Sequence, residues 1–211
     1  MTRAVGVSQF GFGWLVVTTC AARAADPPAK WEERAVAALA AEDRKALKFL
    51  AEDFQKLTPD ARRDLPLRIR EDSVEFAFRG EFPADKEPWK MLEYMVCDRG
   101  RDYETLLVAP DAELPRVEAM RPFFKKHSGE GRRHWWSARL VWAEAETPQS
   151  VELADLLAGL EPVERDRFRD ELSPNGIGLG CGTNVKADIA ALPRKRVPAL
   201  LLLTLRVSAE K

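Results

Sequence analysis

The sequence predicts an α+β protein with an N-terminal helical segment, followed by a mainly antiparallel sheet with helices packed on one side. Apolar residues recur every three or four positions over residues 31–57, and apolar and polar residues alternate over residues 65–79. The first pattern is typical of an amphipathic helix and the second of strands with one buried face. The 211-residue chain is 45% hydrophobic and 32% charged, which is enough to bury a core. We divide it into a leader (1–24), a helical segment (25–60) and an α+β domain (61–211).

Residues 1–24 have the layout of a secretory signal peptide. Arg3 precedes an apolar stretch over residues 10–17, and Ala22-Arg23-Ala24 fits the small-x-small pattern of a cleavage site. The apolar stretch is too short to span a bilayer as a permanent helix. Cleavage after Ala24 removes two arginines and no acid, which takes the net charge from −1 to −3. We therefore expect an exported protein, periplasmic or extracellular, with no transmembrane span in the mature chain.

The cysteines leave two questions open. Residues 17–20 loosely resemble a lipobox, in which Cys20 would carry a lipid anchor, although Thr19 is a poor fit before that cysteine. If the leader is cut after Ala24, the remaining cysteines are Cys97 and Cys181. In an oxidising compartment they either form a disulfide or remain two buried thiols.

Residues 31–57 predict an amphipathic helix or a broken pair of helices, which ends at Thr58-Pro59. The apolar stripe comprises Trp31, Ala35, Leu39, Ala46, Leu47, Leu50, Phe54 and Leu57. We expect it to pack on the protein's own core. The alternative is a helix that docks a partner protein.

Four strands are predicted next, over residues 65–70, 74–79, 92–97 and 103–109. The last two are joined by a short charged link that contains Gly100. A short link with glycine between two apolar runs predicts a β-hairpin.

The rest of the chain predicts helices and strands in alternation. Helices are expected over residues 114–126, bent at Pro122, over 151–160 and over 161–172. Strands are expected over residues 135–142 and 197–207, the latter with a buried helix as the alternative. The glycine-rich residues 173–184 predict a turn or a bulged strand.

Most site chemistries find no support in the sequence. The net charge of −1 gives no global field that favours nucleic acid. No motif with zinc-ligand spacing occurs, no Walker lysine follows the glycine run, and no serine lies in a G-x-S-x-G frame. We predict no cofactor, no metal ligand and no catalytic residue, with Cys97 as the nucleophile of an alternative hydrolase or thiol enzyme.

The most suggestive surface is the stretch over residues 125–136, where cations lie beside two tryptophans. Such a surface can bind a sugar, a lipid head group or an anionic polymer. The competing interpretation is a solvated loop that enters a strand, with one tryptophan packed inward. The candidate ligand patch comprises His127, Arg132, Arg133, Trp135 and Trp136.

Leu92-Glu93-Tyr94, Gly100 and the run Tyr103-Glu104-Thr105-Leu106-Leu107-Val108 resemble the core of the YdjY-like domain. This family occurs in secreted bacterial proteins, many of them from planctomycetes, and its function is uncharacterised. The resemblance covers about residues 65–160 and implies an extracytoplasmic α+β domain. The segment Arg116–Pro122 departs from the family's small, apolar helix, and the resemblance supplies no functional residue.

The sequence therefore favours a secreted cell-envelope or periplasmic protein that acts as a non-catalytic binding or structural module. The sequence does not identify its partner, and the candidates are an envelope protein or a glycan. The alternatives are an envelope enzyme that uses Cys97 and a partner-docking protein that uses the helix at residues 31–57.

Overall fold

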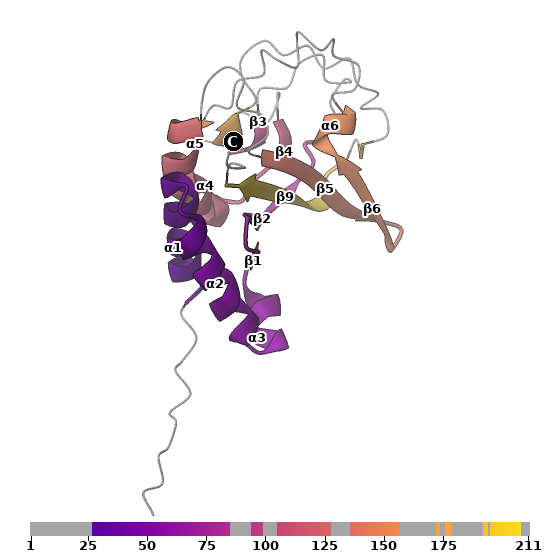
Figure 1. The fold of residues 1–211 in the computed structure, drawn as a ribbon. Coiled ribbons are helices and arrows are strands. Elements are labelled where there is room, and N and C mark those ends of the chain that lie inside the picture. Colours follow the sequence, from indigo (N-terminus) through magenta and orange to yellow (C-terminus); the bar gives the residue numbers. More distant parts are fainter. Residues whose placement is uncertain are drawn as a thin grey trace, which may run out of the picture.

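The computed structural model describes residues 27–84, 94–98, 105–127, 136–156, 172–173, 176–178, 192–193 and 195–207. The predicted leader and the predicted helix over 161–172, except for Leu172, lie outside these residues. Figure 1 shows helices gathered beside one twisted sheet, so the α+β class is confirmed.

Three helices form the N-terminal segment: α1 (Pro28–Ala41), α2 (Arg44–Lys56) and α3 (Pro59–Asp64). The predicted stripe is a broken pair of helices, because Glu42 adopts a left-handed conformation with φ of 55° and ends α1. Asp43 then caps α2 by accepting a hydrogen bond from the Ala46 N–H at 2.8 Å. Thr58 caps α3 in the same way, through the Ala61 N–H at 3.2 Å.

One sheet contains all the described strands, in the order β6-β5-β9-β2-β4-β3-β8-β7, with β1 also paired to β2. Its pairs are antiparallel except for β3 and β4. The strands are β1 (Leu67–Ile69), β2 (Ser73–Glu81), β3 (Tyr94–Cys97), β4 (Thr105–Val108), β5 (Trp136–Glu144), β6 (Thr147–Glu152), β7 (Leu172–Ser173), β8 (Gly176–Gly178) and β9 (Pro198–Arg206).

The predicted hairpin between residues 92–97 and 103–109 is wrong. β3 and β4 are neighbours but run parallel, with Tyr94 opposite Thr105 and Cys97 opposite Val108. Every residue of both strands is buried. Strands covered on both faces are typical of parallel pairs and carry continuous apolar runs instead of an alternating pattern. The continuous runs were the informative signal, and the glycine-containing link between them was misleading.

The helical prediction for residues 114–126 is confirmed as two pieces, α4 (Leu114–Ala119) and α5 (Arg121–His127), preceded by the 3₁₀ turn η2 (Asp111–Glu113). The chain breaks at Met120, two residues before Pro122, whose ring is incompatible with a continuous helix through the preceding turn.

The helix predicted to begin at residue 151 is wrong at its start. Val151 belongs to strand β6, and the described helix α6 covers Leu153–Leu156. β5 and β6 form a hairpin whose two turn residues, Ala145 and Glu146, both have positive φ, 47° and 69°. These angles are typical of the type I′ turn that joins antiparallel strands. No glycine or asparagine marks this turn, which is why the sequence pattern missed it.

The glycine-rich segment contributes β7 and β8, which pair with one another, and β8 meets β3 across a register shift. The expected turn or bulged strand is confirmed in this part. A side chain at Gly176 is excluded because its Cβ would lie 2.2 Å from the Val96 carbonyl oxygen. Glycine therefore allows β8 to approach β3 closely at this point.

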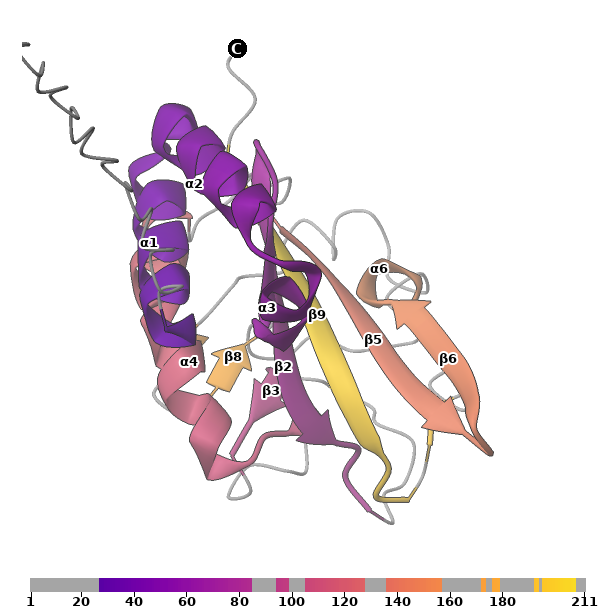
Figure 2. The same ribbon diagram turned by 90° about the horizontal axis from the view of Figure 1, so that it is seen from below.

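One hydrophobic cluster holds the helical segment and the sheet together. It includes Trp31, Leu39 and Phe54 from the helices, and Phe76 and Leu203 from the central strands. The core interpretation of the helical stripe is confirmed by this packing. Figure 2 shows α1, α2 and α4 together on one side of the sheet, and strands β9, β5 and β6 extending beyond them.

Candidate functional site

The structure describes only part of the candidate ligand patch. His127 is the last residue of α5 and Trp136 the first of β5. Trp136 is half-buried, packs against the hydrophobic core and lies opposite Leu205 of β9. It therefore occupies the position of the inward-packing tryptophan. Arg132, Arg133 and Trp135 lie outside the described residues, so a shared ligand patch stays a prediction.

Cys97 lies at the end of β3 and is fully buried. Its Sγ donates a hydrogen bond to the Asp98 carbonyl oxygen at 3.2 Å. A thiol in such an apolar, closed position is a poor nucleophile, because a reactive thiolate needs solvent access and a stabilising charge. Cys181 lies outside the described residues, so the disulfide between the two stays a prediction.

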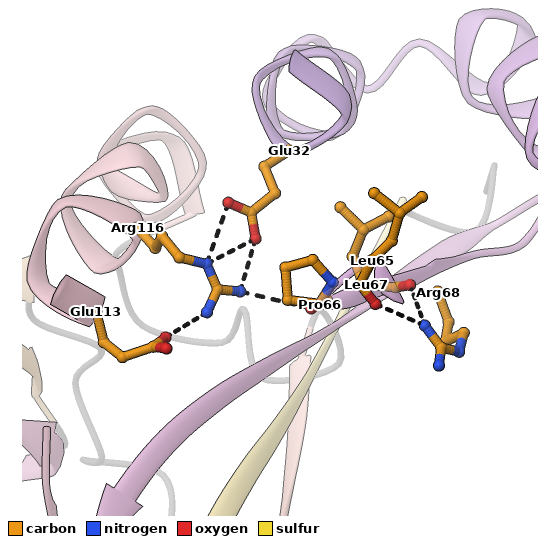
Figure 3. A network of polar contacts seen from close by, with 7 residues as sticks. All are labelled: Glu32, Leu65, Pro66, Leu67, Arg68, Glu113 and Arg116. Carbon is orange, nitrogen blue, oxygen red and sulfur yellow. Dashed lines mark hydrogen bonds and ion pairs between the residues drawn. The ribbon is translucent and has the colours of Figure 1, made fainter. Parts of the chain in front are cut away.

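The most developed polar cluster joins α1 to α4 (Figure 3). Glu32 projects from α1, and Glu113 and Arg116 come from the start of α4 and the turn before it. The Arg116 guanidinium donates from Nε and Nη2 to Oε1 of Glu32, at 2.9 and 2.6 Å. Its Nη1 donates to Oε2 of Glu113. We call these three residues the Arg116 cluster.

The Arg116 cluster also contacts the sheet. Nη2 lies 3.5 Å from the Pro66 carbonyl oxygen, just before β1, and the guanidinium carbon lies 4.9 Å from the centre of the Phe78 ring on β2. The side chains are largely buried, with 18% of Arg116 and 6% of Glu32 exposed. One cation therefore connects the helical layer, α4 and the central strands.

The chemistry of the Arg116 cluster is that of a structural contact. Each guanidinium nitrogen donates to a protein oxygen, so the cation offers no unused nitrogen to an external anion. Both carboxylates accept hydrogen bonds from the same arginine, and such charge-assisted contacts fix the relative positions of the three side chains. Sequence reasoning missed the cluster because Glu32 and Arg116 are 84 positions apart and neither belongs to a motif.

The sheet face opposite the core carries a second, more exposed set of charges. Arg139 of β5 lies 3.9 Å from Glu75 of β2 and 3.8 Å from Glu152 of β6. Leu200 of β9 shares this face and is 36% exposed. The arginine is 43% exposed, so these ion pairs are solvent-screened and contribute little to stability.

Local pairing shifts the pKa values of exposed side chains in two ion pairs. A hydrogen bond from Arg121 lowers the pKa of Glu118, and a hydrogen bond to Asp53 raises the pKa of Lys56. Both pairs join residues three positions apart and are exposed. Asp53 and Lys56 lie within α2, whereas Glu118 lies in α4 and Arg121 begins α5.

Within the described ranges, no group of three or more histidine, cysteine or acidic side chains is placed to hold a metal ion. The same residues include no helix that is both long and apolar enough to cross a membrane.

Comparisons with protein-family models, with curated proteins and with solved structures found no match for this chain. The resemblance to the YdjY-like domain therefore rests on the residues that suggested it. Of these, Tyr94 and residues 105–108 lie in the described part, on β3 and β4.

Proposed function

We propose that this chain is an exported protein of the cell envelope or periplasm, related to the YdjY-like domain, and that it acts as a non-catalytic binding or structural module. The observation that carries the proposal is the leader at residues 1–24, with Arg3, the apolar stretch and the Ala-x-Ala site in the order that export requires.

The position of the first helix supports this assignment. α1 begins at Pro28, four residues beyond Ala24, and its inner face reaches the core through Trp31, Ala35 and Leu39. Cleavage after Ala24 leaves all three of these core residues in the mature chain.

The state of the polar groups supports a module that is not an enzyme. The most buried charged side chains, those of the Arg116 cluster, are engaged with one another and with the backbone. The thiol of Cys97 is enclosed on both faces of its strand. Neither group is available to a substrate in this arrangement.

Export is tested by producing the full chain with a C-terminal tag in a Gram-negative host and fractionating the cells. We expect the tagged protein in the periplasm, with Ala25 as its first residue by mass spectrometry. An Ala22→Leu/Ala24→Leu variant, which removes both small residues of the cleavage site, should accumulate as the uncut precursor. Intact precursor in the cytoplasm for the parent chain contradicts export, and an N-terminus at a lipidated Cys20 identifies the anchored form instead.

The thiol-enzyme alternative is tested by labelling the folded protein with iodoacetamide near neutral pH. Because Cys97 is buried, we expect it to react at least tenfold more slowly than in the urea-unfolded protein. Rapid labelling in the folded state, together with an activity that is lost in Cys97→Ala, would favour the enzyme.

A further inference from the structure

β9 is the strand that joins two parts of the sheet. All nine of its residues pair with β2, from Pro198 opposite Glu81 to Arg206 opposite Ser73. On its other edge it pairs with β5 from Ala199 to Leu205. In the described structure β5 and β6 have no other partner strand in the sheet. The connection between β6-β5 and the remaining strands therefore runs through β9.

The side chains of β9 also fill the centre of the core. Ala199, Leu201, Leu203 and Leu205 point to the same side and are between 0 and 6% exposed, and Val207 continues the row at 6%. Their neighbours across the strand pairs include Phe76 and Phe78 of β2 and Leu140 of β5. Without β9, these aromatic and aliphatic side chains lose their apolar neighbours within the sheet.

The pieces that remain without β9 are poor folding units. β5 and β6 form an isolated hairpin, which is marginally stable in water. β2 keeps β1 over three residue pairs and β4 at the single pair Glu81–Val108. Such short pairings contribute little free energy against the conformational entropy lost in ordering a nine-residue strand.

β9 is nevertheless the last described strand in chain order, since the other eight precede residue 179. A ribosome delivers the chain from its N-terminus, so β9 emerges after every strand that it joins. We propose that β9 is a late-closing strand, a conformational device that keeps the chain unfolded until residues up to Val207 have left the ribosome.

The consequence for export rests on the proposed function. A leader of the kind at residues 1–24 directs the chain into a channel that passes extended polypeptide. A chain whose sheet cannot close early stays suitable for that channel throughout synthesis. The fold then forms in the compartment where β9 meets both β2 and β5.

The folding order is tested on the full chain, extended at its C-terminus by linkers of increasing length and a translation-arrest sequence. Arrested complexes are made in a cell-free system without membranes and treated briefly with protease. We expect a protease-resistant body to appear only when the linker is long enough to bring residue 207 out of the ribosomal tunnel. The same resistant body at linker lengths that hold residues 198–206 inside the tunnel would overturn the proposal.

Two full-chain variants complete the test. Thr204→Pro places a proline in β9, whose N–H groups face partners on both edges, and should lose the resistant body at every linker length. Ser150→Pro is the matched control on the edge strand β6 and should keep the wild-type threshold. A Thr204→Pro chain that becomes resistant at the wild-type linker length contradicts the late-closing strand. The assay contains no export step, so its result is independent of whether the protein is exported.

Discussion

At the scale of single residues, buried polar groups affect the stability of the fold more than exposed polar groups do. Arg116 is surrounded by two carboxylates, a carbonyl and an aromatic ring, whereas Arg121 pairs with Glu118 on an open helix surface. Because water solvates the second pair well and the first pair poorly, the same kind of contact has different consequences at the two places.

Replacing Arg116 by methionine leaves Glu32 and Glu113 buried without a counter-charge. We expect the free energy of unfolding to fall by about 3 kcal/mol, measured by urea denaturation, because an uncompensated buried charge is costly. Arg121→Met is the matched control and should not measurably move the urea midpoint. Equal effects of the two substitutions would contradict a structural role for the Arg116 cluster.

Trp31 presents the opposite case, a buried donor without an acceptor. Its Nε1 makes no hydrogen bond, while its ring meets Phe54 edge to face, with centroids 6.0 Å apart. Trp31→Phe removes the unsatisfied donor and keeps an aromatic ring. The stability gained by removing the buried N–H offsets the stability lost with the smaller ring, so we expect the free energy of unfolding to change by less than about 1 kcal/mol.

Trp31→Ala, by contrast, should lower the free energy of unfolding by about 3–5 kcal/mol, because it leaves a cavity between α1 and α2. Thermal or urea denaturation of both variants measures the difference. A loss for the phenylalanine variant as large as for the alanine variant would show that the indole N–H has a partner in solution.

At the scale of elements, turns are where local sequence and observed structure disagree most. The turn between β5 and β6 places two residues with side chains in the left-handed region, where glycine and asparagine are favoured. The strand pairing on either side, from Glu144–Thr147 to Arg139–Glu152, holds this conformation in place. Tertiary pairing therefore overrides the preference of the two turn residues.

The double substitution Ala145→Asn/Glu146→Gly relieves this strain. Asn-Gly is the favoured type I′ sequence, so we expect about 1 kcal/mol of added stability in urea denaturation. The far-ultraviolet spectrum should not change. A lowered urea midpoint would indicate that the turn has another geometry in solution.

At the scale of the whole molecule, β6 is the outermost of the described strands at one end of the sheet. The two-residue turn fixes the hydrogen-bonding alternation, so the backbone nitrogens of Pro148, Ser150 and Glu152 face away from β5, toward this edge. Proline has no N–H to offer there, and Glu152 adds charge. Both features are typical of edges that avoid pairing with a second molecule.

Pro148→Val restores a donor at this edge and adds a β-branched side chain. We expect the variant to keep its fold but to self-associate more strongly with increasing concentration, as measured by light scattering after size exclusion. Thr147→Val is the matched control, because it adds a similar side chain where the N–H faces β5. If both variants self-associate equally, the added surface hydrophobicity explains the association and the restored N–H at position 148 does not.

Several features followed from sequence pattern, because each depends on neighbours in the chain. The broken helix over residues 31–57, the alternating strand β2 and the apolar strand β9 were predicted within a few residues of their observed bounds. The parallel pairing of β3 with β4 was not, since the choice of partner depends on what covers each face. The Arg116 cluster could not be predicted either, because its members come from distant segments.

The sequence by itself determined the α+β class, the helical stripe and most of the strand positions, because hydrophobic periodicity is a local property. It also carries the predicted leader on which the proposed export depends. Only the tertiary structure decided the strand order, the parallel direction of β4, the burial of Cys97 and the position of β9 at the centre of the sheet. These features are set by which surfaces exclude water together, and that depends on the whole chain.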